Sequence, residues 1–250
     1  MRIRVTVRSV VALALCGALL QVAHAQDEQT TRMRAALAAP ERSAENKARD
    51  EGRKPIETVQ FFGIKTGDTV VDMISVGGWF TEVLSAAVGP RGHVYAQNPP
   101  FIPESDAEKA LIKRLGNAEA LRVPIAQSSV VGKADAVVTA MNLHDIYNGF
   151  ANQPAGEPAA IELLKAIYVA LKPGGVLGLI DHVGIAGQDN AKLHRMLPQQ
   201  ARDAITKAGF VIEAESKLLA NPADDHTKMV FDPAVRGHTD QFVIRARKPR

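Results

Sequence analysis

Two kinds of apolar pattern alternate along most of the chain. Short segments rich in apolar and β-branched residues predict strands at positions 68–74, 93–97, 134–140, 176–180, 210–216 and 241–245. The segment 176–180 is continuously apolar, which is typical of a strand that is buried on both faces of a sheet. Apolar residues that recur every three or four positions predict amphipathic helices instead. This second pattern covers 43–62, 80–88, 104–115, 157–171 and 198–208.

Strands that alternate with helices predict one α/β domain over 43–250. We expect a doubly wound, mostly parallel sheet of about seven strands, with helices on both faces and an antiparallel last strand. Residues 26–42 are polar, alanine-rich and without a clear period, which indicates a flexible leader. The long polar segment 221–240 lies between the last two strands. Such a segment is typical of a lid or binding loop, and a solvated excursion is the alternative.

The first 25 residues have the pattern of a secretory signal. Three arginines precede an apolar run at 10–20, and Ala23-His24-Ala25 follows it. We therefore expect cleavage before Gln26 and a periplasmic or secreted protein. The run is too short to span a bilayer, so we expect no membrane anchor after cleavage. The single cysteine, Cys16, lies within the signal, and Leu15 is too large for a lipoprotein cleavage site.

The basic charge of the chain belongs to this signal. The formal net charge is +3, from 30 basic and 27 acidic residues. Cleavage would remove three arginines and no acid, which leaves the charges balanced. A basic surface for nucleic acid is therefore not indicated. We expect a small-molecule partner instead.

The segment after the first predicted strand carries the motif that suggests a function. It reads Val70-Val71-Asp72-Met73-Ile74-Ser75-Val76-Gly77-Gly78-Trp79. It resembles the first motif of class I S-adenosylmethionine-dependent methyltransferases, a strand that ends in an acid, followed by glycines and a helix. The resemblance extends through 92–96, 134–138 and 171–175. It implies a Rossmann-like methyltransferase fold with S-adenosylmethionine as cofactor, bound by Asp72, Gly77, Gly78 and Asn98.

A narrower resemblance covers the whole mature chain. The chain resembles a group of exported bacterial proteins described as predicted methyltransferases, and the motifs that carry the resemblance are Arg49-Asp50, Arg53-Lys54-Pro55, Gly77-Gly78-Trp79, Leu143-His144-Asp145, Asp181-His182 and the segment 221–225. This resemblance implies methyl transfer from S-adenosylmethionine to an acceptor that it does not specify.

Three positions depart from the family pattern. Ile74 and Val76 replace two glycines, which favours a reshaped loop because β-branched residues resist the backbone angles that glycine adopts. Asn98 replaces the acid that binds the ribose hydroxyls. These departures favour an alternative function, a catalytically silent module that binds another small periplasmic ligand. A dehydrogenase is a weaker interpretation, since the turn lacks G-x-G-x-x-G.

A second polar group follows the fourth and fifth strands of the family's sheet. His144 and Asp145 come after one, Asp181 and His182 after the other. If these strands are neighbours, the four side chains converge at one edge, where we expect them to act on the acceptor, with one as general base. Two histidines and two carboxylates are also suitable ligands for Zn²⁺ or Fe²⁺. The base is favoured and no metal is expected, because no recognised ligand spacing is present.

Two simpler interpretations remain open. Adjacent residues point to opposite faces, so that one member of each pair can instead cap a helix. The basic residues Arg49, Arg53 and Lys54 would guide an anionic ligand, or else form a solvated helix face.

Overall fold

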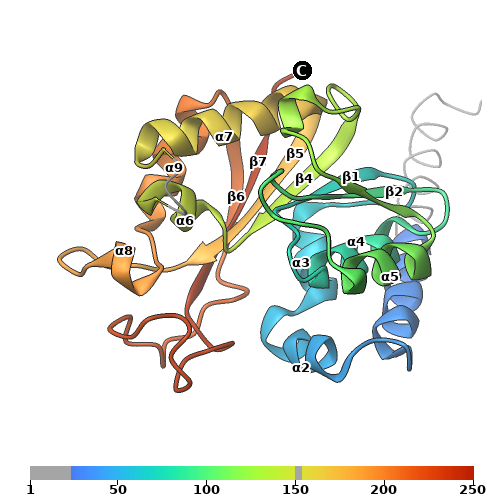
Figure 1. The fold of residues 1–250 in the computed structure, drawn as a ribbon, viewed down its shortest axis with the longest axis horizontal. Coiled ribbons are helices and arrows are strands. Elements are labelled where there is room, and N and C mark those ends of the chain that lie inside the picture. Colours follow the sequence, from blue (N-terminus) through green and yellow to red (C-terminus); the bar gives the residue numbers. More distant parts are fainter. Residues whose placement is uncertain (1–23, 150–153) are drawn as a thin grey trace, which may run out of the picture.

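One seven-stranded sheet organises the domain (Figure 1). The computed structural model describes residues 24–149 and 154–250, and most of the predicted signal, at 1–23, lies outside them. The strands are β1 (Thr69–Met73), β2 (His93–Gln97), β3 (Ala118–Leu121), β4 (Ala134–Ala140), β5 (Leu171–His182), β6 (Val211–Ser216) and β7 (Gln241–Arg247). Their order is β3-β2-β1-β4-β5-β7-β6.

The predicted sheet is confirmed. Strands β1 to β5 pair in parallel, and the last strand, β7, pairs antiparallel with both β5 and β6. Because the parallel strands share a direction, the carboxyl ends of β1, β2, β4 and β5 lie at one edge. Figure 1 shows α2 and α8 beyond this end of the sheet.

Both faces of the sheet are covered, as expected from the continuous apolar run at 176–180. Along β1, Val70 belongs to one core cluster and Val71 to the other. The first cluster packs under α3 (Pro55–Phe62) and α4 (Trp79–Val88), and α5 (Asp106–Leu115) lies beside α4. The second packs under α7 (Glu157–Ala170) and α9 (Pro198–Lys207), on the opposite side of the sheet (Figure 1).

Several elements differ from their predicted bounds. The helix predicted over 43–62 is two helices, α2 (Ala44–Arg53) and α3, because Pro55 disfavours a helical residue before it and Lys54 has a φ of 42°. Strand β5 begins at Leu171 and includes the expected helix stop. Four short elements were not predicted, because each is too short to show a helical or strand period in the sequence. They are β3, a 3₁₀ turn at Ile125–Gln127, α6 (Leu143–Asn148) and α8 (Asn190–Leu193).

The segment expected to be a loose leader is an ordered helix. Residues 24–38 are helical, and Met33 is fully buried in the core beside α3 and α4. Gln29 donates to the carbonyls of Ile64 and Ala87, each at 3.0 Å. The helix docks mainly through polar side chains that satisfy carbonyl groups, so its apolar pattern is weak. None of the helices in the described part of the chain is long and apolar enough to cross a membrane.

Candidate active site at the carboxyl edge of the sheet

The loop after β1 keeps glycine-like backbone angles without the glycines. Ile74 has a φ of 58° and Val76 a φ of 34°, both in the left-handed region. A β-branched residue is an outlier there, at a cost of order 1–3 kcal/mol. The expected reshaping therefore does not remove the unusual angles from these positions. Instead, the backbone strain at Ile74 and Val76 lies next to a cavity, and strained residues are concentrated at functional sites.

Asn98 holds this loop in place from the end of β2. Its Oδ1 accepts a hydrogen bond from the Val76 backbone at 3.0 Å, and its Nδ2 donates to Ser75 Oγ at 2.9 Å. The side chain is almost completely buried. Asn98 was expected to bind the ribose, whereas in the structure its buried side chain holds the loop through these two hydrogen bonds.

Asp72 also supports the loop from the interior. The residue is 3% exposed, and its Oδ2 accepts a hydrogen bond from Thr81 Oγ1 at 2.6 Å in the first turn of α4. Burial raises the pKa of Asp72 to about 6, against the effect of the Thr81 hydrogen bonds. Asp72 is absent from the walls of the cavity beside the loop.

A cavity of about 530 Å³ opens beside the loop, between α2 and α5. Gly77 and Gly78 line it, as expected of cofactor-binding glycines. A Cβ on Gly78 would meet Leu111 Cδ2 at 2.2 Å, whereas one on Gly77 would meet nothing closer than Arg49 Nη1 at 3.8 Å. Gly78 is therefore needed for packing, and Gly77 leaves room for a ligand. A second cavity, of about 390 Å³, extends along α4 to Pro90, away from the strand ends.

A carboxylate missed by sequence reasoning lines the cavity between α2 and α5. Glu108 on α5 is 8% exposed, and its Oε1 accepts from Asn98 Nδ2 at 3.3 Å. Its other oxygen pairs with Arg122. In the sequence Glu108 looks like an ordinary acid in the first turn of a helix, with Ser105 as the cap. Only the fold places it beside position 98.

Trp79 docks α2 over the loop. Its indole Nε1 donates to the Asn46 carbonyl at 3.1 Å and to Asp50 Oδ1 at 2.9 Å. The Arg53 guanidinium lies 4.8 Å from the centre of its ring. Burial lowers the pKa of Arg53 to about 10, helped by the nearby charge of Arg49, so Arg53 stays protonated at neutral pH.

The predicted basic group divides between two places. Arg49 lines the cavity and pairs with Glu45, and Arg53 reaches Met141 Sδ at 4.0 Å, beyond the end of β4. Lys54 instead donates to the Leu218 carbonyl at 2.8 Å. Two cationic side chains therefore face the carboxyl edge.

His144 and Asp181 form the centre of the second polar group. Strands β4 and β5 are neighbours, as expected, and Ala140 pairs with Ile180. His144 Nδ1 lies 2.6 Å from Asp181 Oδ1, and the His144 backbone N–H donates to Asp181 Oδ2 at 2.9 Å. Burial by itself would lower the pKa of His144, but the charges of Asp181 and Asp145 raise it to about 10. His144 is therefore protonated at neutral pH and does not have the properties of a general base.

His182 is buried beside this pair in a neutral form. Its Nδ1 lies 2.8 Å from Thr239 Oγ1, and its ring packs edge-on against His144, with the centres 5.5 Å apart. Burial lowers the pKa of His182 to about 4, despite the nearby charge of Asp181. A histidine with this pKa is a weak base at neutral pH.

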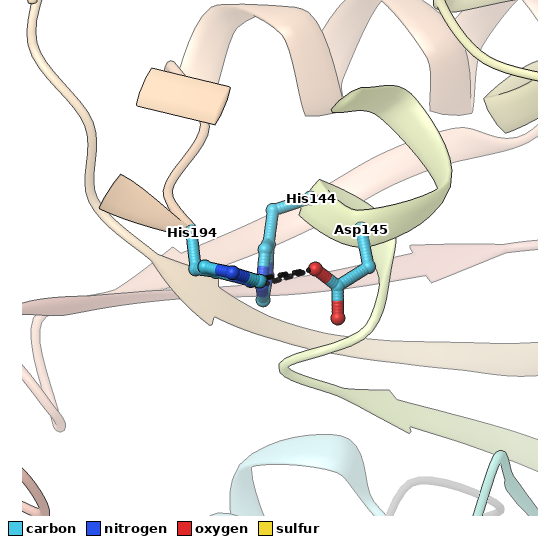
Figure 2. Close-up of side chains that lie close together, drawn as sticks. All are labelled: His144, Asp145 and His194. Atoms are coloured by element: carbon cyan, nitrogen blue, oxygen red, sulfur yellow. Dashed lines mark hydrogen bonds and ion pairs between the residues drawn. The ribbon is translucent and has the colours of Figure 1, made fainter. Parts of the chain in front are cut away.

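Asp145 leads from the buried pair toward the surface and meets a third histidine, His194. Its Oδ1 lies 3.2 Å from His144 Nε2 and 2.9 Å from His194 Nδ1 (Figure 2). His194 follows α8, 49 positions from Asp145, and belongs to no motif that would have predicted its place. The fold thus joins His144, Asp145 and Asp181 with an unpredicted histidine, and His182 contacts them through its ring.

The segment 221–240 is anchored at this site. Arg195 is fully buried and pairs through two nitrogens with Asp224, at 2.8 and 3.1 Å. The Asp240 backbone donates to the same carboxylate at 2.7 Å. The Phe231 ring packs edge-on against His194, with the centres 5.1 Å apart. The segment is therefore anchored at Asp224 and Asp240 and forms a wall of the polar group at Phe231, while most of its other residues are exposed to solvent.

Comparisons with known proteins agree with this architecture. No family model matches the sequence, and no curated protein sequence matches it. An S-adenosylmethionine-dependent methyltransferase from Aquifex aeolicus is similar in structure, with a TM-score of 0.55 at 18% identity over 80% of this chain and 98% of that one. The 4+2 cyclase SpnF has a TM-score of 0.57 at 16% identity, over 79% of this chain and 80% of its own.

A third similar structure contains a product of the cofactor. It is a 1,6-didemethyltoxoflavin-N1-methyltransferase from Burkholderia thailandensis, solved with 1,6-didemethyltoxoflavin and S-adenosylhomocysteine. Its TM-score is 0.53 at 15% identity, and the match covers 100% of this chain and 94% of that one. Together these similarities show that the chain has the fold of the class I S-adenosylmethionine-dependent methyltransferases.

Proposed function

We propose that the protein is an S-adenosylmethionine-dependent methyltransferase with a small-molecule acceptor. The observation that carries this proposal is the strained loop after β1, which keeps glycine-like angles at Ile74 and Val76 beside a cavity of about 530 Å³. Such strain is maintained where the surrounding structure and a ligand require it. The volume lies within the usual range for small-molecule sites, roughly 300–1,000 Å³.

The lining of the cavity fits the chemistry of this cofactor. Gly77 allows a close approach to the main chain, and Glu108 offers a carboxylate of the type that accepts ribose hydroxyl groups. Arg49 supplies positive charge for a carboxylate on the ligand. When bound, the cofactor supplies an electrophilic methyl group on a sulfonium.

The polar group at β4 and β5 suits an acceptor that needs positioning rather than deprotonation. His144 is protonated and His182 is a weak base, so neither removes a proton readily at neutral pH. Asp145 remains ionised, because the hydrogen bonds and charges of His144 and His194 lower its pKa against the effect of burial. These residues would orient polar groups of the acceptor, and orientation can supply much of the rate.

The proposal is tested by calorimetric titration with S-adenosylmethionine and S-adenosylhomocysteine. We expect one saturable site, weakened at least about tenfold by Gly77→Leu, which fills the cavity, and by Glu108→Gln, which removes the charge-assisted hydrogen bond. Glu119→Gln is the matched control, since Glu119 is an exposed acid on β3. If the wild type binds neither compound, the methyltransferase proposal fails and the catalytically silent module is favoured.

We also propose export by the N-terminal signal. The packed contacts of the first helix begin at Gln29, so cleavage before Gln26 would leave them in place. The intact mass of protein from a periplasmic extract of the native cells tests this. A mass that includes residues 1–25 would contradict it.

A further inference from the structure

We propose that His144, Asp145 and His194 form a binding site for a divalent transition-metal ion of the Zn²⁺ or Fe²⁺ type. One potential ligand atom from each residue lies within 4.8 Å of the other two. Figure 2 shows the three side chains converging from α6 and from the end of α8. This role goes beyond methyl transfer and does not depend on cofactor binding.

The donor atoms have the right chemistry for such an ion. Two imidazoles and one carboxylate are a common set for catalytic Zn²⁺ and for non-haem Fe²⁺, with the remaining positions left for water or substrate. No ligand spacing was visible in the sequence, because the second imidazole is 49 positions from Asp145. The fold provides the third ligand that the pattern lacked.

A buried and unpartnered nitrogen points to a ligand independently. The side chain of His144 is 2% exposed, yet its Nε2 has no hydrogen-bond partner among residues 24–149 and 154–250. It lies 3.2 Å from Asp145 Oδ1, outside hydrogen-bond geometry. Buried polar atoms are rarely left unpaired, so an unpaired nitrogen in this position indicates a missing partner.

Asp181 prepares His144 for this role. It accepts from the opposite ring nitrogen, Nδ1, at 2.6 Å, and it fixes the backbone of the same residue. Binding of an ion would release the Nε2 proton of His144, and the Asp181 carboxylate would keep the remaining proton on Nδ1, so that the lone pair on Nε2 can bind the ion, as in many metal sites. Asp181 is thus a positioning residue, not a ligand.

The surroundings favour a cation and give access to it. Neither Asp145 nor Asp181 forms an ion pair with lysine or arginine among the described residues. The side chains of Asp145 and His194 are 28% and 33% exposed, so the open side of an ion would face solvent. His194 is itself held in the left-handed region, with a φ of 53°, between α8 and the buried Arg195. Such strain is typical of a constrained site.

The test is metal binding by the purified protein after treatment with a chelator. Co²⁺ serves as the probe, because its visible absorption reports nitrogen and oxygen coordination, and Zn²⁺ competition confirms that the two ions share a site. We expect one equivalent of Co²⁺ in the wild type. His194→Asn and Asp145→Asn should each lower the affinity by about 100-fold or more, and Asp181→Asn by roughly 10- to 100-fold.

His194→Asn is chosen because asparagine tolerates the left-handed backbone. His226→Asn is the matched control: His226 has a φ of 62°, and its Nε2 also lies 3.0 Å from a carboxylate, that of Asp240, but it belongs to no three-residue cluster among the described residues. Thermal melts would verify that each variant is folded. Failure of the wild type to bind Co²⁺, an unchanged affinity in both His194→Asn and Asp145→Asn, or an equal loss in His226→Asn would overturn the proposal.

Discussion

Asp181 binds both the backbone and the ring of His144, so that one buried carboxylate joins the ends of β4 and β5. The same carboxylate accepts the His182 backbone N–H at 2.8 Å. This arrangement combines the two interpretations that the sequence left open, because the pair both caps a helix and faces the candidate site.

Asp181→Ala should therefore destabilise the protein. It would leave a buried, protonated imidazole and two backbone N–H groups without an acceptor, which costs roughly 3 kcal/mol or more. Asp203→Ala, at an exposed acid on α9, should change the stability by less than about 0.5 kcal/mol. Urea denaturation of both variants measures the difference. Equal midpoints would show that Asp181 has no structural role.

Asn98→Asp should weaken the loop, although the family pattern has an acid at this position. The new carboxylate would lie beside Glu108, since Asn98 Nδ2 and Glu108 Oε1 are 3.3 Å apart, and it would lose the donor to Ser75. We expect a lower melting temperature and weaker S-adenosylhomocysteine binding. The double variant Asn98→Asp/Glu108→Gln should recover stability, because it removes the repulsion between the two acids. A single variant that is as stable as the wild type would contradict this account.

The fold could be predicted from the sequence because its signals are strong and local. Strands at 93–97 and 134–140 were predicted with the bounds that the structure shows, since apolar residues recur in both segments and a glycine, Gly92 or Gly132, lies just before each. Short elements escaped prediction, because four to six residues do not reveal a period. The helix at 24–38 escaped for another reason: it docks through Gln29 and Arg32, and polar residues usually indicate solvent.

The candidate site could be predicted only in part. Motifs located Gly77, His144 and Asp181, because each follows a predicted strand. They did not locate Glu108 or His194, whose places depend on how α5 and α8 fold back over the edge. Nor could they show that Ile74 and Val76 would keep positive φ angles, since that conformation is held by contacts distant in the sequence, such as that of Asn98.

The raised pKa of the buried Asp72 carboxyl predicts how the stability of the protein changes with pH. Burial disfavours the carboxylate and raises the pKa of Asp72 to about 6 in the folded protein, from the ordinary value of 3.8 that applies in the unfolded chain. Below about pH 4 the group is protonated in both states and has no effect. Between about pH 4 and pH 6 the unfolded chain loses this proton while the folded protein still holds it, so the stability falls by up to roughly 3 kcal/mol and stays at the lower level above pH 6.

Asp72→Asn should remove this dependence. The amide oxygen can still accept from Thr81, so the variant should be more stable than the wild type at pH 7 and similar to it near pH 4. Urea denaturation from pH 4 to pH 8 would measure the gap. A gap that is constant over this range would show that Asp72 titrates normally in the folded protein.

The ion pair between Arg195 and Asp224 fixes the wall of the polar group. Both side chains are completely buried, and two hydrogen bonds join them. Asp224→Ala would leave the guanidinium without its counter-charge, a loss that typically costs 3–5 kcal/mol. It would also release the Asp240 backbone N–H from its acceptor. We therefore expect a lower unfolding midpoint in urea.

The neighbouring Asp225 provides the control. It is exposed, and among the described residues its carboxylate accepts hydrogen bonds from Thr227 alone, so Asp225→Ala should change the stability by about 0.5 kcal/mol or less. Limited proteolysis should separate the two variants further, because Asp224→Ala frees the segment 221–240 and Asp225→Ala does not. Since Phe231 packs on His194, release of this wall should also weaken Co²⁺ binding in Asp224→Ala. Equal cleavage of the two variants would mean that other contacts hold the segment, and that the buried pair contributes to stability without positioning His194.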